Sequence, residues 1–199
     1  MAAEGKKTRG TTWAVLGVVC AMVMGVYAWS AHSGVLESLG SGAQDSYYNL
    51  LVRGFRDGQL NVKREAPPGS AQVADWTWLD AHGLDDLSLY NGKLYLYFGI
   101  TPALALFWPY LALTGHYLPH KDAVAIFLSV GFLVSAGLLC AVWRRYFKGT
   151  GVWAVAAGAL ALGVANFATA ILEEGDVYQV AISCGYSMTM LALAGVWRA

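Results

Sequence analysis

Four long apolar stretches limit this sequence more than any other feature. They cover residues 11–31, 123–143, 150–172 and 177–197, and none of them contains Asp, Glu, Lys or Arg. A helix rises about 1.5 Å per residue, so about 20 such residues cross the roughly 30 Å hydrocarbon core of a bilayer. With 57% apolar and 13% charged residues overall, the sequence predicts an all-α membrane protein with about four transmembrane helices.

Charge and cysteine content exclude several classes of protein. Thirteen Lys and Arg balance thirteen Asp and Glu, so the net charge gives no reason to expect a nucleic acid partner. Cys20, Cys140 and Cys184 all lie in the apolar stretches, without a second Cys or a His at metal-ligand spacing. We interpret them as small apolar residues rather than as a disulfide framework or a zinc site.

A fifth uncharged segment, residues 99–118, decides the topology. It contains Pro102 and Pro109, and if it crossed the membrane the basic loop at 144–149 would face outward, against the positive-inside rule. We therefore expect it to lie at the surface or to re-enter the membrane. This predicts a cytoplasmic N-terminus (1–10), a large outer loop (32–122), a cytoplasmic loop (144–149) and an outer acidic loop (173–176). We expect the protein in a bacterial inner membrane, with the large loop periplasmic or extracellular.

The third stretch also carries small residues at helical spacing, which indicate a helix-packing face. They are Ala154, Gly158, Ala161 and Ala165.

The outer loop begins with a predicted amphipathic helix over residues 45–57. Four apolar residues recur at i, i+3, i+4 and i+7, and Gly58 is suited to end the helix. They are Tyr48, Leu51, Val52 and Phe55. Such a helix can lie on the membrane with Arg53 towards lipid phosphates, and Asp45 at its start suits an N-cap.

A β-hairpin is predicted over residues 87–98. Asn91 and Gly92 suit the two positive φ angles of a type I′ turn. In that register Leu89 lies opposite Leu94, and Tyr90 lies opposite Lys93, so the turn fixes the direction of the lysine.

The order of these motifs resembles that of bacterial GT-C glycosyltransferases, and more narrowly the dolichyl-phosphate-mannose protein mannosyltransferase-like group. The resemblance rests on QDSYY at residues 44–48, YNGKLYLYFG at 90–99, and the Pro-containing apolar segment that precedes the next span. In layout it covers the whole chain. Such enzymes have more spans than four, so the resemblance implies the N-terminal portion of a larger transferase.

The resemblance implies transfer of a sugar from a polyprenyl-phosphate donor to an acceptor lipid, glycan or protein at the outer face. Asp45 matches the acidic base of the family, although Ser46 replaces the Glu that follows it there. Lys93 matches a lysine near the donor phosphate. We assign Arg53 as a second phosphate contact, and Tyr48 and Tyr95 as substrate contacts. Glu174 and Asp176 are weak candidates for a divalent metal, and no cofactor is firmly implied.

The chemistry fits these residue types. Inverting transfer needs a base for the acceptor proton and a cation for charge that grows on the departing phosphate. Each residue also has a plainer interpretation: Asp45 as a helix cap, Lys93 as an exposed hairpin residue, the tyrosines as membrane-interface aromatics, and His116 and His120 as interface residues. The alternative function is a non-catalytic multi-span membrane subunit that binds lipid or a partner protein.

Overall fold

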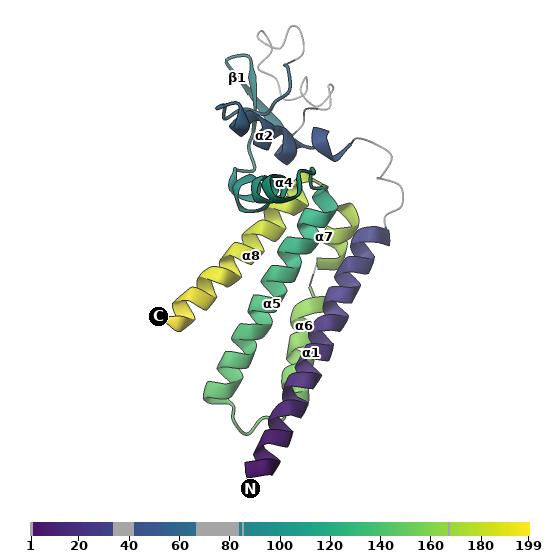
Figure 1. The fold of residues 1–199 in the computed structure, drawn as a ribbon, viewed down its shortest axis with the longest axis vertical. Helices are drawn as coiled ribbons and strands as arrows, with labels where there is room; N and C mark the ends of the chain where they lie inside the picture. The colour runs from purple at the N-terminus through teal and green to yellow at the C-terminus, as the bar shows by residue number, and fades with distance from the viewer. Residues whose placement is uncertain (1, 34–41, 67–83, 85, 167) are drawn as a thin grey trace. The chain divides into compact units, whose positions relative to one another are not determined.

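The computed structural model describes residues 2–33, 42–66, 84, 86–166 and 168–199 (Figure 1). The chain divides into two compact units. The helical unit comprises residues 1–35, 124–175 and 182–199, and the loop unit comprises residues 36–123 and 176–181.

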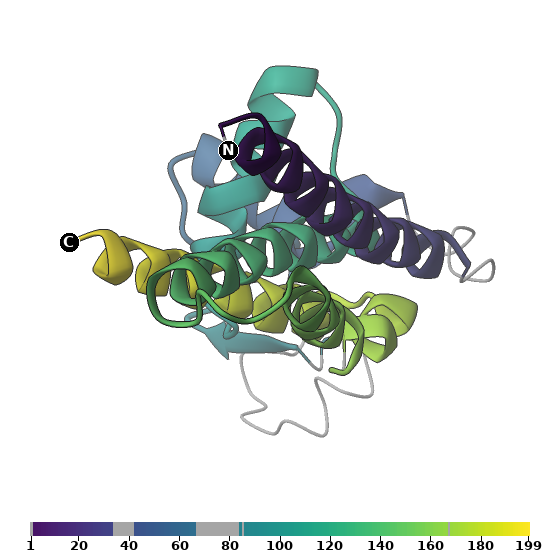
Figure 2. The same cartoon turned by 90° about the horizontal axis from the view of Figure 1, so that it is seen from below.

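Helices make up the helical unit, and Figure 2 shows them with both chain ends in view. They are α1 (Ala2–Ser33), α5 (His120–Tyr146), α6 (Val152–Val164), α7 (Ala168–Glu174) and α8 (Val177–Arg198). Within the described residues, four segments are long and apolar enough to cross a membrane. They are Thr12–Ala31, His120–Tyr146, Val152–Glu174 and Val177–Arg198. The predicted fold class, a helical membrane protein with four spans, is confirmed.

The third predicted span, residues 150–172, consists of two helices rather than one. Asn166 separates them, because its Nδ2 donates to the Leu162 carbonyl (2.8 Å) and its Oδ1 accepts from the Ala168 N–H (2.9 Å). The Tyr27 hydroxyl of α1 donates to the Gly163 carbonyl at 2.7 Å, near the end of α6. This bond satisfies a backbone group at a depth where lipid offers no donor.

Helix α6 packs through a different face from the one that its small residues indicated. Its buried residues are Val155, Ala156, Ala159 and Gly163. Of the predicted face, Gly158 is half-buried beside Leu139, whereas Ala154, Ala161 and Ala165 are exposed. A Cβ added at Gly163 would meet Val23 Cγ1 at 2.5 Å and Phe132 Cε2 at 3.1 Å. Glycine therefore allows α6 to approach α1 and α5 closely.

Helices α5 and α8 are joined by polar bonds inside the helical unit. The Ser135 and Tyr186 hydroxyls lie 2.9 Å apart, and the Ser187 hydroxyl donates to the Phe127 carbonyl. The Tyr186 ring also occupies the space beside Gly131 that a side chain would need. Hydroxyl groups inside these spans thus have partners within the unit.

The loop unit contains a 3₁₀ turn, η1 (Ala43–Asp45), helix α2 (Tyr47–Arg56), and the hairpin strands β1 (Leu87–Tyr90) and β2 (Lys93–Leu96). The predicted hairpin register is confirmed, with Leu89 opposite Leu94 and Tyr90 opposite Lys93. Asn91 and Gly92 have φ angles of 48° and 72°, as a type I′ turn requires.

The apolar face of α2 is covered by protein rather than left for lipid. Tyr48, Leu51 and Val52 are buried, and the Tyr48 ring lies 5.2 Å from the ring of Phe107. Phe107 ends a π-helical turn, η3 (Ala103–Phe107). The periodicity therefore predicted the helix and its apolar face correctly, but the partner of that face came from a distant part of the chain.

The segment at 99–118 forms η3 and then α4 (Trp108–Thr114), which ends at Gly115 with a φ of 73°. Pro109 has no N–H for the usual i−4 bond, which accounts for the irregular turn before it. The apolar helix Ala103–Thr114 extends roughly 18 Å, too short to cross about 30 Å of hydrocarbon. It is not a fifth span of ordinary length, and the side of the membrane that each loop faces stays a prediction.

Candidate functional site

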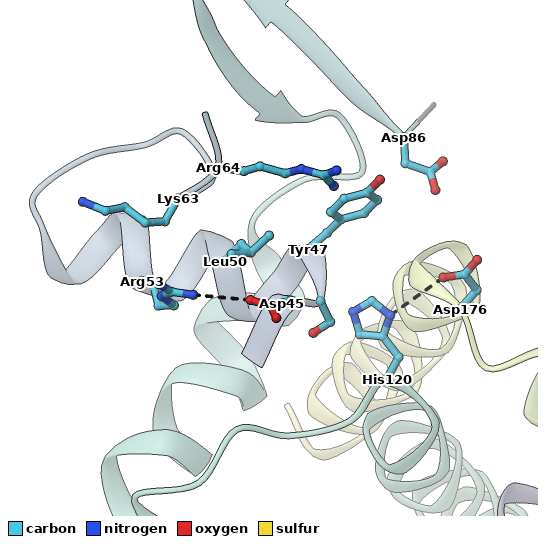
Figure 3. A pocket seen from close by; sticks show the side chains of 10 residues that line it. Asp45, Tyr47, Leu50, Arg53, Lys63, Arg64, Asp86, His120 and Asp176 are labelled. Atoms are coloured by element: carbon cyan, nitrogen blue, oxygen red, sulfur yellow. Dashed lines mark ion pairs between the residues drawn. The ribbon is translucent and has the colours of Figure 1, made fainter. Parts of the chain in front are cut away.

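A cleft of about 670 Å³ opens in the loop unit (Figure 3). Its volume lies in the range of small-molecule sites. The lining is rich in charged and polar side chains from five segments of the chain: Asp45, Ser46, Tyr47, Leu50, Arg53, Lys63, Arg64, Asp86, His120 and Asp176. Carboxylates, full cations and one imidazole therefore share a single cavity.

Asp45 is the last residue of η1 and lies opposite Arg53 of α2. Its Oδ1 is 3.8 Å from Arg53 Nη1, and its side chain is 56% exposed. The N-cap of α2 is Ser46, with no side-chain capping bond, so the alternative interpretation of Asp45 as the cap is wrong. An ion pair this exposed is weak and screened by solvent. The carboxylate is thus held near a cation yet open to a ligand.

Asn49 fixes the turn that carries Asp45. Its side chain is fully buried, and the two hydrogens of Nδ2 are shared among three acceptors within hydrogen-bond distance: the Ala43 carbonyl (2.7 Å), Ser46 Oγ (2.9 Å) and the Leu118 carbonyl (2.8 Å). One amide therefore joins η1, the start of α2 and the segment that enters α5. The sequence placed Asn49 on the polar side of the helix and gave no sign of these distant partners.

The chain that follows α2 folds back along the helix and brings two further cations to the cleft. Gly58, with a φ of 70°, turns the chain, and the Lys63 N–H donates to the Leu50 carbonyl at 3.0 Å. Gly54 leaves room for this return, because a Cβ there would collide with the Asn61 carbonyl. The sequence interpretation assigned no chemistry to this segment.

The returning segment is also bonded to the hairpin. The Val62 N–H donates to the Leu94 carbonyl of β2 at 2.9 Å. Lys63 Nζ contacts the Asp57 carboxylate, and this hydrogen bond, with the charge of the lysine, lowers the pKa of Asp57. The segment that carries Lys63 and Arg64 is therefore bonded to α2 through Lys63 and to β2 through Val62.

His120 and Asp176 form a pair at another part of the cleft (Figure 3). His120 Nδ1 lies 3.9 Å from Asp176 Oδ1. The neighbouring His120 imidazole lowers the pKa of Asp176 against the effect of burial, and the Val177 N–H, which donates to Asp176 Oδ1 at 2.7 Å, lowers it further. The imidazole packs edge-on against the rings of Tyr48 and Phe107, at 5.8 and 5.9 Å.

Sequence reasoning missed this pair. His120 was interpreted as an interface residue and Asp176 as a weak metal candidate, because 56 positions of chain separate them and no motif links them. The sequence offered one indication that the two residues could meet, which is that each stands where an apolar span begins.

The predicted site residues divide into two groups. Asp45, Arg53 and Asp176 line the cleft. Lys93 is exposed on the hairpin and Tyr95 is half-buried with its ring 6.4 Å from that of Tyr90; neither lines the cleft.

Tyr48 is fully buried and packs beside His120, which gives it a packing role beneath the cleft. Glu174 ends α7 in the helical unit, whereas Asp176 belongs to the loop unit. In the part of the chain that the structure describes, no group of three or more His, Cys, Asp or Glu side chains is arranged to hold a metal ion.

Comparisons of the chain with protein-family models, with curated proteins and with solved structures found no match. The GT-C resemblance thus rests on the motifs alone, and the function has to be argued from the chemistry of the cleft.

Proposed function

We propose that this chain belongs to an integral membrane glycosyltransferase of the GT-C type, which transfers a sugar from a polyprenyl-phosphate donor to an acceptor hydroxyl at the outer face of a bacterial inner membrane. One observation carries the proposal: a single cleft holds the accessible carboxylate of Asp45 together with the cations of Arg53, Lys63 and Arg64. A base and a phosphate-binding group are the two components that such a transfer requires.

In this proposal Asp45 is the general base. Its carboxylate takes the proton of the acceptor hydroxyl as that oxygen forms a bond to the anomeric carbon of the sugar. The bond from that carbon to the phosphate oxygen breaks on the opposite side, and the electron pair leaves with the polyprenyl phosphate. Arg53 lies 3.8 Å from this carboxylate, so base and cation stand side by side in the cleft.

The cations stabilise the phosphate as its charge grows. Arginine side chains bind phosphate oxygens through paired N–H groups, and lysine adds a point charge. We therefore propose Arg53, Lys63 and Arg64 as the donor-phosphate contacts, since all three line the cleft. The role of Lys93 at the hairpin turn stays a separate prediction.

The position of the cleft in the chain supports a lipid-linked donor. His120 is the first residue of one candidate span, and Asp176 directly precedes another. A cleft lined by the first residue of one span and by the residue just before another is suited to a ligand whose head is polar and whose tail lies in hydrocarbon.

The test is Asp45→Asn in the protein expressed from its gene in membrane vesicles. The assay measures transfer of radiolabelled sugar from undecaprenyl-phosphate-linked mannose, and then from other undecaprenyl-phosphate sugars. We expect the rate to fall about 10²- to 10⁴-fold, with binding of undecaprenyl phosphate retained. Glu65→Gln is the matched control, because this exposed carboxylate of the same unit does not line the cleft.

The outcomes separate the two functions. A transfer rate unchanged in Asp45→Asn would show that Asp45 is not the base. Binding of undecaprenyl phosphate that depends on Arg53 and Arg64, without transfer of any sugar, would instead favour the non-catalytic lipid-binding subunit.

A further inference from the structure

The helical unit contains a groove that the proposed reaction does not use. It has a volume of about 360 Å³, and its walls come from three candidate spans. Leu16, Gly17 and Cys20 of α1 face Leu133, Gly137 and Cys140 of α5, and α6 contributes to the wall. Apart from one arginine, the side chains that form this groove are apolar or are small thiols.

The arginine is Arg144, near the end of α5. Its guanidinium lies 4.3 Å from the centre of the Trp13 ring, on the first turns of the α1 span. Stacking occupies the face of the guanidinium and leaves its in-plane N–H groups to bind an acceptor. No carboxylate forms an ion pair with Arg144 among the described side chains. An apolar groove thus ends at a positive charge.

The groove is open where two glycines form its walls. A Cβ added at Gly17 or at Gly137 would meet no atom within 4 Å, in contrast to Gly163, where a Cβ would collide with a neighbouring helix. Within a bilayer such open apolar space is filled by hydrocarbon, because an empty void forfeits dispersion contacts and water finds few polar partners there.

Shape and charge identify the occupant. The groove between α1 and α5 is apolar up to Arg144, which suits a hydrocarbon chain, and the cation at its end selects a negative headgroup. We propose that this groove binds one acyl chain of an anionic phospholipid, with its phosphate at Arg144.

This site is separate from the proposed reaction. The groove and the cleft share no lining residue, since the groove lies within the helical unit and the cleft within the loop unit. The lipid at Arg144 is therefore a ligand in addition to the proposed donor. The inference stands whether or not the protein is a glycosyltransferase.

Native mass spectrometry of the detergent-purified chain tests whether the groove prefers an anionic headgroup. We expect palmitoyl-oleoyl phosphatidylglycerol to be retained about fivefold more than the phosphatidylcholine with the same chains, the ratio expected from one basic residue near a membrane surface. Arg144→Gln should remove that preference. Arg145→Gln is the control, because this neighbour lies over the Tyr146 and Trp197 rings and does not line the groove.

Filling the groove tests the position of the acyl chain. Gly17→Leu should reduce retention of both lipids, whereas Gly25→Leu should not, since Gly25 also has open space but lies outside the groove. Wild-type protein gives an independent measurement: phosphatidylglycerol with a photoactivatable acyl chain should label α1 and α5 around Cys20 and Cys140.

Three results would overturn the inference. They are equal retention of the two lipids by the wild-type protein, labelling confined to other helices, and displacement of the phospholipid by undecaprenyl phosphate. The last result would place the donor chain in this groove. If Gly17→Leu does not fold, the labelling pattern of the wild-type protein still decides the position.

Discussion

Asn49 shows how much of the candidate site depends on one side chain that touches no ligand. The amide lies in the first turn of α2, and its acceptors lie six residues before it and 69 residues after it. The carboxylate that we propose as the base is therefore positioned by a buried neighbour.

We predict that Asn49→Ala destabilises the loop unit by about 1–3 kcal/mol, because the buried Leu118 carbonyl loses its donor. The transfer rate should fall further than stability alone explains, since η1 is no longer fixed beside α2. Thermal unfolding followed by tryptophan fluorescence measures the first effect, and the sugar-transfer assay measures the second. Gln44→Ala, at an exposed amide of η1, is the control and should change neither.

The contribution of Asn49 could not be predicted from the sequence. Periodicity places this residue on one side of a helix, but the Leu118 carbonyl reaches it only after the chain has passed through the hairpin and η3. Asp45 was predicted from its match to the family motif and Arg53 from its place on a local helix, whereas the pairing of His120 with Asp176 needed tertiary contacts.

Among the elements of the loop unit, α2 and the segment at 59–64 that runs back along it are the central pair. This segment packs closely against Gly54, where the backbone of Asn61 occupies the space of a side chain. The hairpin register follows directly from Asn91 and Gly92, which explains why it was predicted correctly. The packing of this segment against α2 was not predicted, because a glycine inside a helix indicates only a less stable helix and does not indicate which part of the chain packs against it.

Gly54→Ala is expected to destabilise the loop unit, although alanine normally stabilises a helix interior by about 1 kcal/mol relative to glycine. The added Cβ must displace Asn61, at an overpacking cost of about 1–3 kcal/mol. Lys63 and Arg64 should shift with that segment, so undecaprenyl phosphate should bind more weakly. Binding and thermal unfolding are the measurements.

The control for this prediction is Gly185→Ala on α8, where a Cβ meets no atom within 4 Å. A Gly54→Ala protein with an unchanged melting temperature and unchanged binding of undecaprenyl phosphate would contradict this prediction. It would show that the segment around Asn61 moves to make room for the added Cβ at little cost.

At the scale of the whole molecule, the two units are stabilised by different interactions. The helical unit buries apolar residues, small residues and paired hydroxyls, whereas the loop unit also holds ion pairs at Asp57 and Asp176. The sequence predicted the four spans well, since length and composition alone determine them. It could not predict the charged cleft, which forms only when five segments of chain meet.

This difference predicts that acid unfolds the loop unit first. The pKa values of Asp57 and Asp176 are lowered from 3.8 in the folded protein, so both carboxylates contribute stability that is present above about pH 4. This contribution is lost as the pH falls through the lowered values, because protonation then favours the unfolded chain. Below pH 4, amide hydrogen exchange read by mass spectrometry should report opening of the loop unit at a lower temperature, while circular dichroism retains most of the helix signal.

Asp176→Asn should reduce this dependence on pH, and Glu65→Gln is the control. A single transition that moves equally for both signals would show that the units unfold together.

The break between α6 and α7 bears on the order in which the chain enters a membrane. A span that arrives alone would carry the Gly163 carbonyl into lipid without the Tyr27 hydroxyl that binds it in the folded protein. Tyr27 belongs to the first span, which is synthesised and inserted before the third. The donor is therefore already in the bilayer when its acceptor arrives, and the linear order of the sequence serves as the assembly order of the bundle.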